Sequence, residues 1–364
     1  MKSLPSGVGV AFAAAALFGA STPFAKLLLG EVSPLLLAGL LYLGSGMGLF
    51  LVRLLRQSST RSNREAALPR AQWGWLAGAV VFGGALGPAL LMLGLQSTAA
   101  ATASLLLNLE GVFTALLAWF VFRENFDNRI ALGMVFIVAG GLVLSWQPGK
   151  GLAVTSGALF VVGACLCWGV DNNLTQKVSS SDPFQIAAIK GLVAGGVNLA
   201  IALALGAHLP PIRVLALALV VGFFGYGLSL ACFVLALRHI GTSRTGAYFS
   251  LAPFVGALVS LLLLRESVGP LFVAAGALMG LGVWLHLTEK HEHEHGHERL
   301  EHSHGHVHDE HHQHEHAPGV DPTEPHTHEH THELMTHSHA HFPDIHHRHD
   351  HQTDTAQKGE TVLL

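Results

Sequence analysis

Charged side chains are scarce in this sequence. Asp, Glu, Lys and Arg together make up 12% of the residues, whereas hydrophobic residues make up 50% and the mean hydropathy is +0.45. Soluble domains carry about 25% charged residues. The composition therefore excludes an ordinary soluble domain and indicates a protein of the lipid bilayer.

Cysteines and the short motifs of common enzymes are also rare or missing. The three cysteines, Cys165, Cys167 and Cys232, lie in apolar runs, where an odd number argues against a disulfide framework. Buried cysteine is far more often a small packing residue than a metal ligand. The sequence has no P-loop, no G-x-S-x-G and no H-E-x-x-H. We therefore expect no enzyme and no required cofactor, and any movement of a solute across the bilayer would have to draw its energy from a proton or counter-solute gradient.

Long apolar runs dominate the first four fifths of the chain. A membrane-spanning helix needs about 20 predominantly apolar residues. Ten runs approach this length, at residues 8–29, 33–54, 73–95, 98–122, 129–146, 152–174, 184–206, 213–237, 242–264 and 268–287. We predict an all-α integral membrane protein with ten transmembrane helices.

The distribution of basic residues predicts how these helices are oriented. The longest connection, between the second and third runs, holds Arg53, Arg56, Arg61, Arg64 and Arg70. Short Arg-rich loops face the cytoplasm, so we expect an inner-membrane protein with both termini cytoplasmic. The basic residues lie in short loops rather than on one face, so nucleic acid is not an expected partner.

Two parts of the chain resemble each other. GLQSTAAATASLLLNLEGVFTALLAWFVFRE (94–124) aligns without gaps with ALRHIGTSRTGAYFSLAPFVGALVSLLLLRE (236–266), and LFGASTPFAKLLLGEVSP (17–34) resembles LCWGVDNNLTQKVSSSDP (166–183). Five helices per half is an odd number, so the halves would enter the membrane from opposite sides, as in many secondary transporters. We predict inverted five-helix repeats at 1–147 and 148–288, followed by a tail at 289–364.

Glu110, Asp171 and Lys190 fall at depth within the predicted spans, with Lys26 and Arg244 nearer the edges. A charge at the bilayer centre costs about 2.5–3.5 kcal/mol on insertion scales, so it normally faces a cavity or a partner. Asp171 precedes the end of the sixth span, and Lys190 lies about 10 Å along the seventh at 1.5 Å per residue. An ion pair at this depth is expected. Its role, as a structural pin or as a gate, is open, because buried pairs are weak evidence for either.

The Arg-Glu pairs that end both aligned segments, Arg123-Glu124 and Arg265-Glu266, together with the five-helix halves, resemble the EamA-type members of the drug/metabolite transporter superfamily over residues 8–287. The resemblance implies a central cavity lined by helices one, three, four, six, eight and nine. It also implies export or exchange of amino acids, metabolites or drugs. With Lys190 added from the ion pair, the predicted substrate-binding or gating residues are Asn108, Glu110, Asp171, Asn172, Lys190 and Tyr248.

The tail departs from this family pattern. Twenty-three of the 26 histidines lie between His291 and His351, interleaved with Glu, Asp, Pro and Thr. Apolar residues are too few for a core, so we expect disorder. Neutral imidazole suits Zn, Ni, Co and Cu, and such binding must weaken below about pH 6.5. The candidate ligands are His291, His293, His295, His297, His302, His304, His306, His308, His311, His312, His314 and His316.

These patterns favour a secondary active transporter that exports a small organic metabolite or drug and carries a regulatory metal-binding tail. An exporter of divalent Zn, Ni or Co, with the tail collecting cargo, is the alternative. A third hypothesis is a membrane sensor whose spans only anchor the tail. A pathway for divalent ions would usually offer several Asp, Glu or His residues within the spans, and Glu110 and Asp171 are nearly all this body offers. Substrate, direction, coupling ion and oligomeric state are not set by these patterns.

Overall fold

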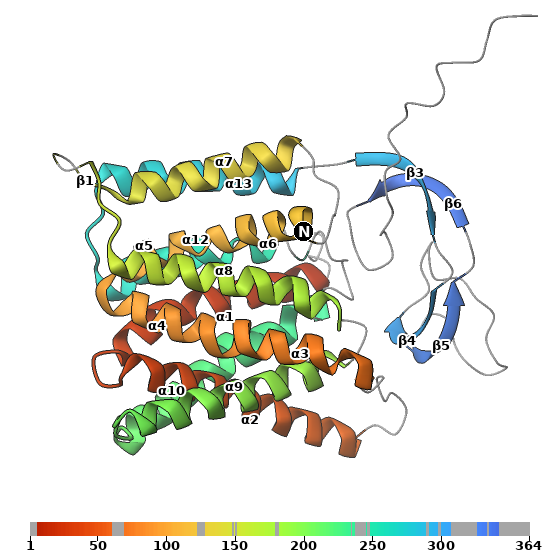
Figure 1. Ribbon diagram of the computed structural model, residues 1–364, viewed down its shortest axis with the longest axis horizontal. Helices are drawn as coiled ribbons and strands as arrows, with labels where there is room; N and C mark the ends of the chain where they lie inside the picture. The colour runs from red at the N-terminus through yellow and green to blue at the C-terminus, as the bar shows by residue number, and fades with distance from the viewer. Residues whose placement is uncertain are drawn as a thin grey trace, which may run out of the picture.

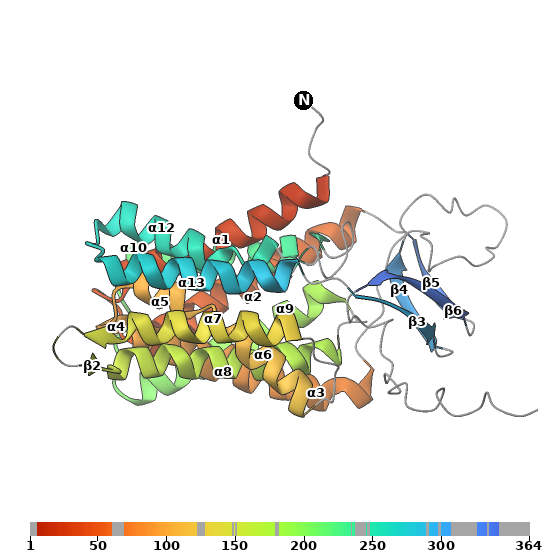
Figure 2. The same cartoon turned by 90° about the horizontal axis from the view of Figure 1, so that it is seen from above.

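The body of the protein is a bundle of helices that run along one common direction (Figure 1). The structure is a computed structural model, and it describes residues 6–59, 69–121, 128–147, 149, 151–178, 182–233, 235–236, 245, 248–288, 291–297, 300–306, 326–332 and 335–341. Figure 2 shows that the helices also share this direction when the bundle is seen from above. The mainly helical architecture predicted from the apolar runs is confirmed.

The first part of the bundle ends in a short hairpin. Its helices are α1 (Ser6–Leu28), α2 (Pro34–Ser59), η1 (Arg70–Gln72), α3 (Trp73–Ala79), the π-helical η2 (Val80–Leu86), α4 (Gly87–Ser97), α5 (Ala100–Leu106), α6 (Leu109–Phe120) and α7 (Asn128–Leu144). Strands β1 (Trp146–Gln147) and β2 (Gly151–Leu152) then pair antiparallel.

The second part contains α8 (Ser156–Gln176), α9 (Pro183–Ala204), α10 (Ile212–Gly222), the π-helical η3 (Phe223–Leu228), α12 (Ala252–Leu264) and α13 (Pro270–Leu287). Local chemistry fixes two of the helix starts. The Thr155 hydroxyl accepts the Ala158 N–H at 3.2 Å, and the Asp182 carboxylate accepts the Phe184 N–H at 2.9 Å with Pro183 following. These are N-cap side chains, each of which satisfies an otherwise unpaired donor.

Among the described residues, eight helical segments are long and apolar enough to cross a membrane. They are Gly7–Leu28, Pro34–Leu55, Arg70–Ser97, Ala100–Phe120, Ser156–Thr175, Phe184–Ala204, Ile212–Phe233 and Pro270–Leu287. Two of the ten predicted spans coincide with shorter apolar helices, Asn128–Leu144 and Ala252–Leu264.

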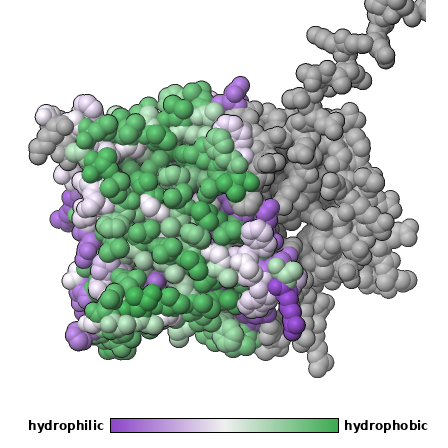
Figure 3. Space-filling view, viewed as in Figure 1, coloured by the Kyte–Doolittle hydropathy of each residue, from purple (hydrophilic) through white to green (hydrophobic). Residues whose placement is uncertain are grey.

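The surface of the bundle fits a bilayer. In Figure 3 a hydrophobic band covers the middle of the visible face, and hydrophilic residues gather at the two ends of the helices. Large apolar side chains point outward, among them Phe120 with 67% and Leu262 with 72% of its surface exposed. Exposed apolar area on this scale marks a membrane or interaction surface.

Small residues let the helices approach closely. α2 packs against α9, and a Cβ atom on Gly191 of α9 would lie 2.6 Å from the backbone nitrogen of Gly46 on α2. Contact between helix backbones through glycine is typical of membrane helices, which gain little from burying apolar side chains out of lipid. α7 packs against α13, and the two lie side by side at one edge of the bundle in Figure 1.

Four segments of the tail are strands. Strands β3 (His291–His297) and β6 (Met335–His341) pair antiparallel, as do β4 (Leu300–His306) and β5 (His326–His332). These segments alternate histidine with Glu, Ser, Thr, Gly or Ala, and a two-residue alternation matches the period of a strand. Composition alone did not reveal this pairing, because the partner segments lie far apart in the chain.

Candidate functional site

The predicted ion pair between Asp171 and Lys190 is present. Asp171 on α8 is 6% exposed, and its carboxylate binds the Lys190 ammonium of α9. The Thr175 hydroxyl, one turn further along α8, donates to the other carboxylate oxygen at 3.0 Å. Both oxygens of this buried carboxylate therefore have a partner, as a charge taken out of water requires.

A glycine of the π-helical segment makes room for this carboxylate. A Cβ atom on Gly83 would lie 1.9 Å from the Asp171 Oδ2 atom and 2.0 Å from its Cγ atom. Every residue other than glycine would therefore displace Asp171. Gly83 is thus required where η2 meets α8.

The carbonyl oxygen of Gly83 binds two further side chains. The Gly87 N–H donates to Phe82, five residues earlier, and the residue five beyond Gly83 is Pro88, which has no N–H. The free Gly83 carbonyl instead accepts the Tyr42 hydroxyl at 2.7 Å and the Trp168 indole N–H at 3.0 Å. Local π-helical geometry often occurs at functional sites, and here it exposes an acceptor at the junction of three helices.

A second group of polar residues joins α8 to α6. The Asn172 amide donates to a Glu110 carboxylate oxygen at 2.9 Å and to the Thr114 hydroxyl at 3.2 Å. The neighbouring Asn173 amide donates to the Thr114 carbonyl at 3.1 Å and to the Gly169 carbonyl at 2.9 Å. Asn173 is buried, Glu110 is half-buried and Asn172 is exposed, so this group extends from the packed interior to the accessible surface.

These contacts explain why three polar residues occur in succession on α8. Consecutive positions on a helix point about 100° apart, because a turn contains 3.6 residues. Asp171 contacts α9, whereas Asn172 and Asn173 contact α6. One helix therefore connects two separate polar contacts, and we refer to Glu110, Thr114, Asp171, Asn172 and Lys190 together as the polar cluster.

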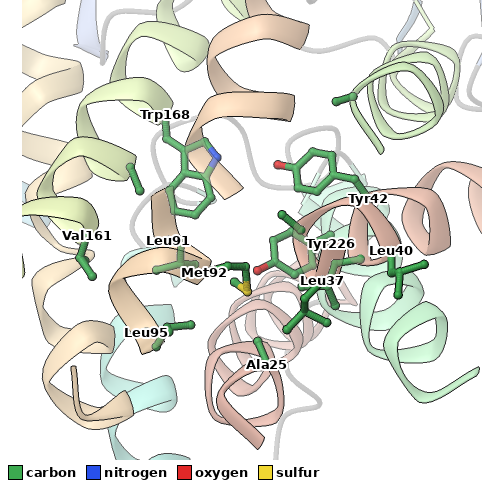
Figure 4. Close-up of a cluster of buried hydrophobic side chains, with 14 of the residues drawn as sticks. Ala25, Leu37, Leu40, Tyr42, Leu91, Met92, Leu95, Val161, Trp168 and Tyr226 are labelled. Atoms are coloured by element: carbon green, nitrogen blue, oxygen red, sulfur yellow. The ribbon is translucent and has the colours of Figure 1, made fainter. Parts of the chain in front are cut away.

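Aromatic side chains pack beside the polar cluster. Figure 4 shows Tyr42 and Trp168 with their polar atoms directed toward the same central region, next to Tyr226. The Tyr42 and Tyr226 rings lie 5.5 Å apart, and Phe18 packs edge-on against Tyr226 at 5.8 Å and against Trp168 at 6.3 Å. These rings come from α1, α2, α8 and η3, so both parts of the chain contribute to this aromatic group.

Two predicted site residues lie outside the polar cluster. Asn108 is 6% exposed, and its amide donates to the Leu105 carbonyl at 2.9 Å, within the break between α5 and α6. Tyr248 packs its ring against Phe12 of α1 at 4.9 Å. The structure thus brings together four of the six predicted residues: Glu110, Asp171, Asn172 and Lys190.

The histidines predicted as metal ligands lie where the structure describes no side chains. The histidines proposed as metal ligands fall in β3 and β4 or outside the described residues, and their side chains are not described. Within the part of the chain whose side chains are described, no group of three His, Cys, Asp or Glu residues could hold a metal ion.

Sequence reasoning missed the contribution of Gly83, Tyr42 and Thr175 to the site. Pro88 was a usable signal for a free carbonyl, but in an α-helix that carbonyl would be four residues earlier, at Gly84, and only the π-helical register moves it to Gly83. Tyr42 carried no comparable signal, because a tyrosine in an apolar helix is usually a packing residue.

Comparison with known proteins agrees with this architecture. The model of the EamA-like transporter family matches two successive segments, residues 5–146 and 155–288. An uncharacterized transporter of Methanothermobacter thermautotrophicus is 31% identical over 282 residues, covering 74% of this chain and 82% of that protein. A probable 4-amino-4-deoxy-L-arabinose-phosphoundecaprenol flippase subunit, ArnE, of Pseudomonas fluorescens is 37% identical over 111 residues, 30% of this chain and 92% of its own length.

A solved crystal structure shares the fold. It has a TM-score of 0.57 at 17% identity and covers 78% of this chain and 96% of its own. Such a likeness shows the fold alone. The two family matches together span the whole helical bundle, from α1 to α13. The chain therefore belongs to the EamA-like transporter family and is a multi-pass membrane transporter.

Proposed function

We propose that this protein is a secondary active transporter that exports a small polar organic solute across the inner membrane. The observation that carries the proposal is the polar cluster. It combines a buried ion pair, Asp171–Lys190, with an accessible carboxylate and amide, Glu110 and Asn172, on the same helix α8 and its neighbours. Charged groups are costly within a membrane and normally face a pathway or a partner. Glu110 accepts one hydrogen bond from the uncharged Asn172 amide, and this contact leaves its carboxylate available to a solute or a proton.

Replacing Glu110 with glutamine tests this role. The variant keeps the size of the side chain and an acceptor for the Asn172 amide, so we expect normal insertion and folding but loss of solute flux in proteoliposomes. A thermal-shift screen of the full-length protein against amino acids, metabolites and metals would first identify the solute. Glu31→Gln, at an exposed site in the turn after α1, is the matched control and should transport normally. Undiminished flux in Glu110→Gln would remove this residue from the mechanism.

We further infer that the bundle consists of ten spans in two inverted five-helix repeats. The two family matches support it, as do equivalent breaks in the helices. The alignment of 94–124 with 236–266 has an offset of 142 residues (236 − 94). Extended toward the N-terminus at the same offset, it places η2 (Val80–Leu86) opposite 222–228, where η3 (Phe223–Leu228) lies. It also places the start of α7 opposite the start of α13. Both spans four and nine contain a turn, at Leu107–Asn108 and at Ser250–Leu251.

The orientation with both termini cytoplasmic is tested by labelling from outside intact cells. A cysteine at Leu209, exposed between α9 and α10, should react with a membrane-impermeant maleimide. A cysteine at Arg70, exposed at the start of η1, should not react. The opposite pattern would invert the topology.

The register of the tail strands supports a second proposal, that the tail binds transition-metal ions and regulates transport. In the β3–β6 pair His291, His293 and His295 stand opposite His341, His339 and His337, and in the β4–β5 pair His302, His304 and His306 stand opposite His330, His328 and His326. Each ladder therefore pairs three histidines of one strand with three of the other, and imidazole is a ligand for Zn, Ni, Co and Cu.

Isothermal titration of the full-length protein with zinc measures this binding. Replacing His293 and His339, an opposite pair, with alanine should lower the number of ions bound more than replacing His311 and His312, which are neighbours in sequence. Equal losses would mean that composition, and not strand register, sets the binding.

A further inference from the structure

The fourth span is divided between two groups of helices. α5 packs against α12, which in turn packs against α1, whereas α6 packs against α8, which also packs against α4. The helix is interrupted between these two parts at Leu107–Asn108, where the side-chain amide of Asn108 donates a hydrogen bond to the Leu105 carbonyl. A span whose two parts belong to different groups can bend at the interruption when the groups move apart.

A carboxylate fixes α5 to the first group. Glu266, in the connection between α12 and α13, accepts the Ala100 N–H at 2.7 Å and the Ala101 N–H at 2.9 Å. These are the first amides of α5, which have no partner within their own helix. Charge-assisted bonds to both carboxylate oxygens are among the stronger hydrogen bonds, so α5 is held to the end of α12. This contact also gives a physical role to the Glu of the Arg265-Glu266 pair.

An ammonium group joins the two groups at the same end of the bundle. Lys26, near the end of α1, donates through Nζ to the Thr98 carbonyl at 3.0 Å, to the Gln96 carbonyl at 3.4 Å and to the Leu95 carbonyl. Leu95 and Gln96 lie in the last turn of α4, whose carbonyls are unpaired and carry the negative end of the helix dipole. Lys26 therefore binds the end of α4 from α1, across the boundary between the groups.

We propose that Lys26 is the gating residue of this end of the bundle, where its ammonium holds the α1–α12 group against the α4–α6–α8 group. When its bonds to the end of α4 break, the groups part at this end about the interruption at Leu107–Asn108, and Glu266 makes α5 move with α12. The proposal rests on the proposed transport function, in which this end faces away from the cytoplasm. It assigns Lys26 and Glu266 roles that lie outside the polar cluster.

Distances between spin labels across this boundary test the gate. Labels at Gly30, after α1, and Leu159, near the start of α8, lie in different groups at the Lys26 end, and both positions are exposed. Labels at Ala13 on α1 and Ala77 on α3, also exposed, lie toward the opposite end of the bundle. The full-length protein in lipid nanodiscs, with its three cysteines replaced by alanine, is measured by pulsed electron paramagnetic resonance without solute.

We expect Lys26→Met to raise the ratio of long to short Gly30–Leu159 distances about tenfold, equivalent to about 1.4 kcal/mol. The Ala13–Ala77 distance should not lengthen. Lys26→Arg, which keeps the charge and the donors, should stay close to the native distribution. Lys26→Gln, which keeps one neutral donor group, should shift in the same direction as methionine but less. Glu31→Gln, at an exposed position of the same end, is the control for a general change of charge.

An unchanged Gly30–Leu159 distribution in Lys26→Met overturns the proposal. It is also overturned if both the Met and the Gln variants unfold, because Lys26 is then needed for the fold itself. The measurement separates this proposal from the transport proposal. If Lys26→Met lengthens the distances but the native protein moves no solute, the gate proposal stands and the transport proposal fails. If the native protein transports solute but Lys26→Met leaves the distances unchanged, only the gate proposal fails.

Discussion

Replacing Asp171 with asparagine should destabilise the protein by about 3 kcal/mol. The side chains of Asp171 and Lys190 are 8% and 14% exposed, so the variant leaves the Lys190 ammonium buried without its counter-charge. Breaking a buried ion pair by removing one partner costs about 3–5 kcal/mol, and the residual exposure favours the lower end of this range. Lys190→Met should cost a similar amount, because it leaves the Asp171 carboxylate with only the Thr175 hydroxyl.

The double variant Asp171→Asn/Lys190→Met should be more stable than either single variant. It leaves no buried charge, and the Thr175 hydroxyl can still donate to the amide oxygen. Replacing a whole buried pair by neutral groups is often close to neutral in free energy, so we expect a total cost of about 1 kcal/mol. Equilibrium unfolding in mixed micelles, followed by circular dichroism, gives the four free energies of this double-mutant cycle.

The second ion pair of the bundle is the control. Arg53 of α2 binds Asp182 at 3.3 Å, and the Arg53 side chain is 30% exposed, so Arg53→Gln should cost at most about 1 kcal/mol. Additive losses in the Asp171/Lys190 cycle, or single losses no larger than that of Arg53→Gln, would refute the reasoning. A double variant that regains stability but moves no solute would show that the pair acts in transport and not only in folding.

Three further changes follow from individual contacts. Gly83→Ala should lower stability or expression strongly, since its Cβ atom would lie 1.9 Å from a carboxylate oxygen of Asp171. Gly74→Ala is the control and should be tolerated, because its Cβ atom would have nothing within 4 Å; thermal melting compares the two variants. Asp182→Ala should lower the free energy of unfolding by about 1 kcal/mol, because it removes the N-cap of α9. Asp182→Asn should keep most of the native stability, because an asparagine side chain also caps a helix. Tyr42→Phe should cost about 1 kcal/mol in the same assay, because the Gly83 carbonyl keeps the indole N–H as its other donor.

The Asp171–Lys190 ion pair shows which contacts between helices can be predicted from the sequence. The position of Asp171 near the end of one span and of Lys190 near the start of the next predicted their contact, since a short connection makes adjacent helices antiparallel neighbours. The Asn172–Glu110 contact was not predicted, because nothing in the sequence says that the sixth span packs against the fourth rather than against another helix.

The apolar runs, the scarcity of charge and the paired Arg-Glu segments by themselves determined a helical membrane transporter of the EamA-like type, because a bilayer admits few ways to satisfy a backbone. Apart from the Asp171–Lys190 pair, tertiary structure alone decided which polar groups meet. The free Gly83 carbonyl, the Lys26 contacts with α4 and the Glu266 contacts with α5 join residues far apart in the chain. Apolar periodicity specifies that a segment is a helix and which environment it enters, but the choice of neighbour depends on the close fit of small residues such as Gly83 and Gly191, which only the folded bundle reveals.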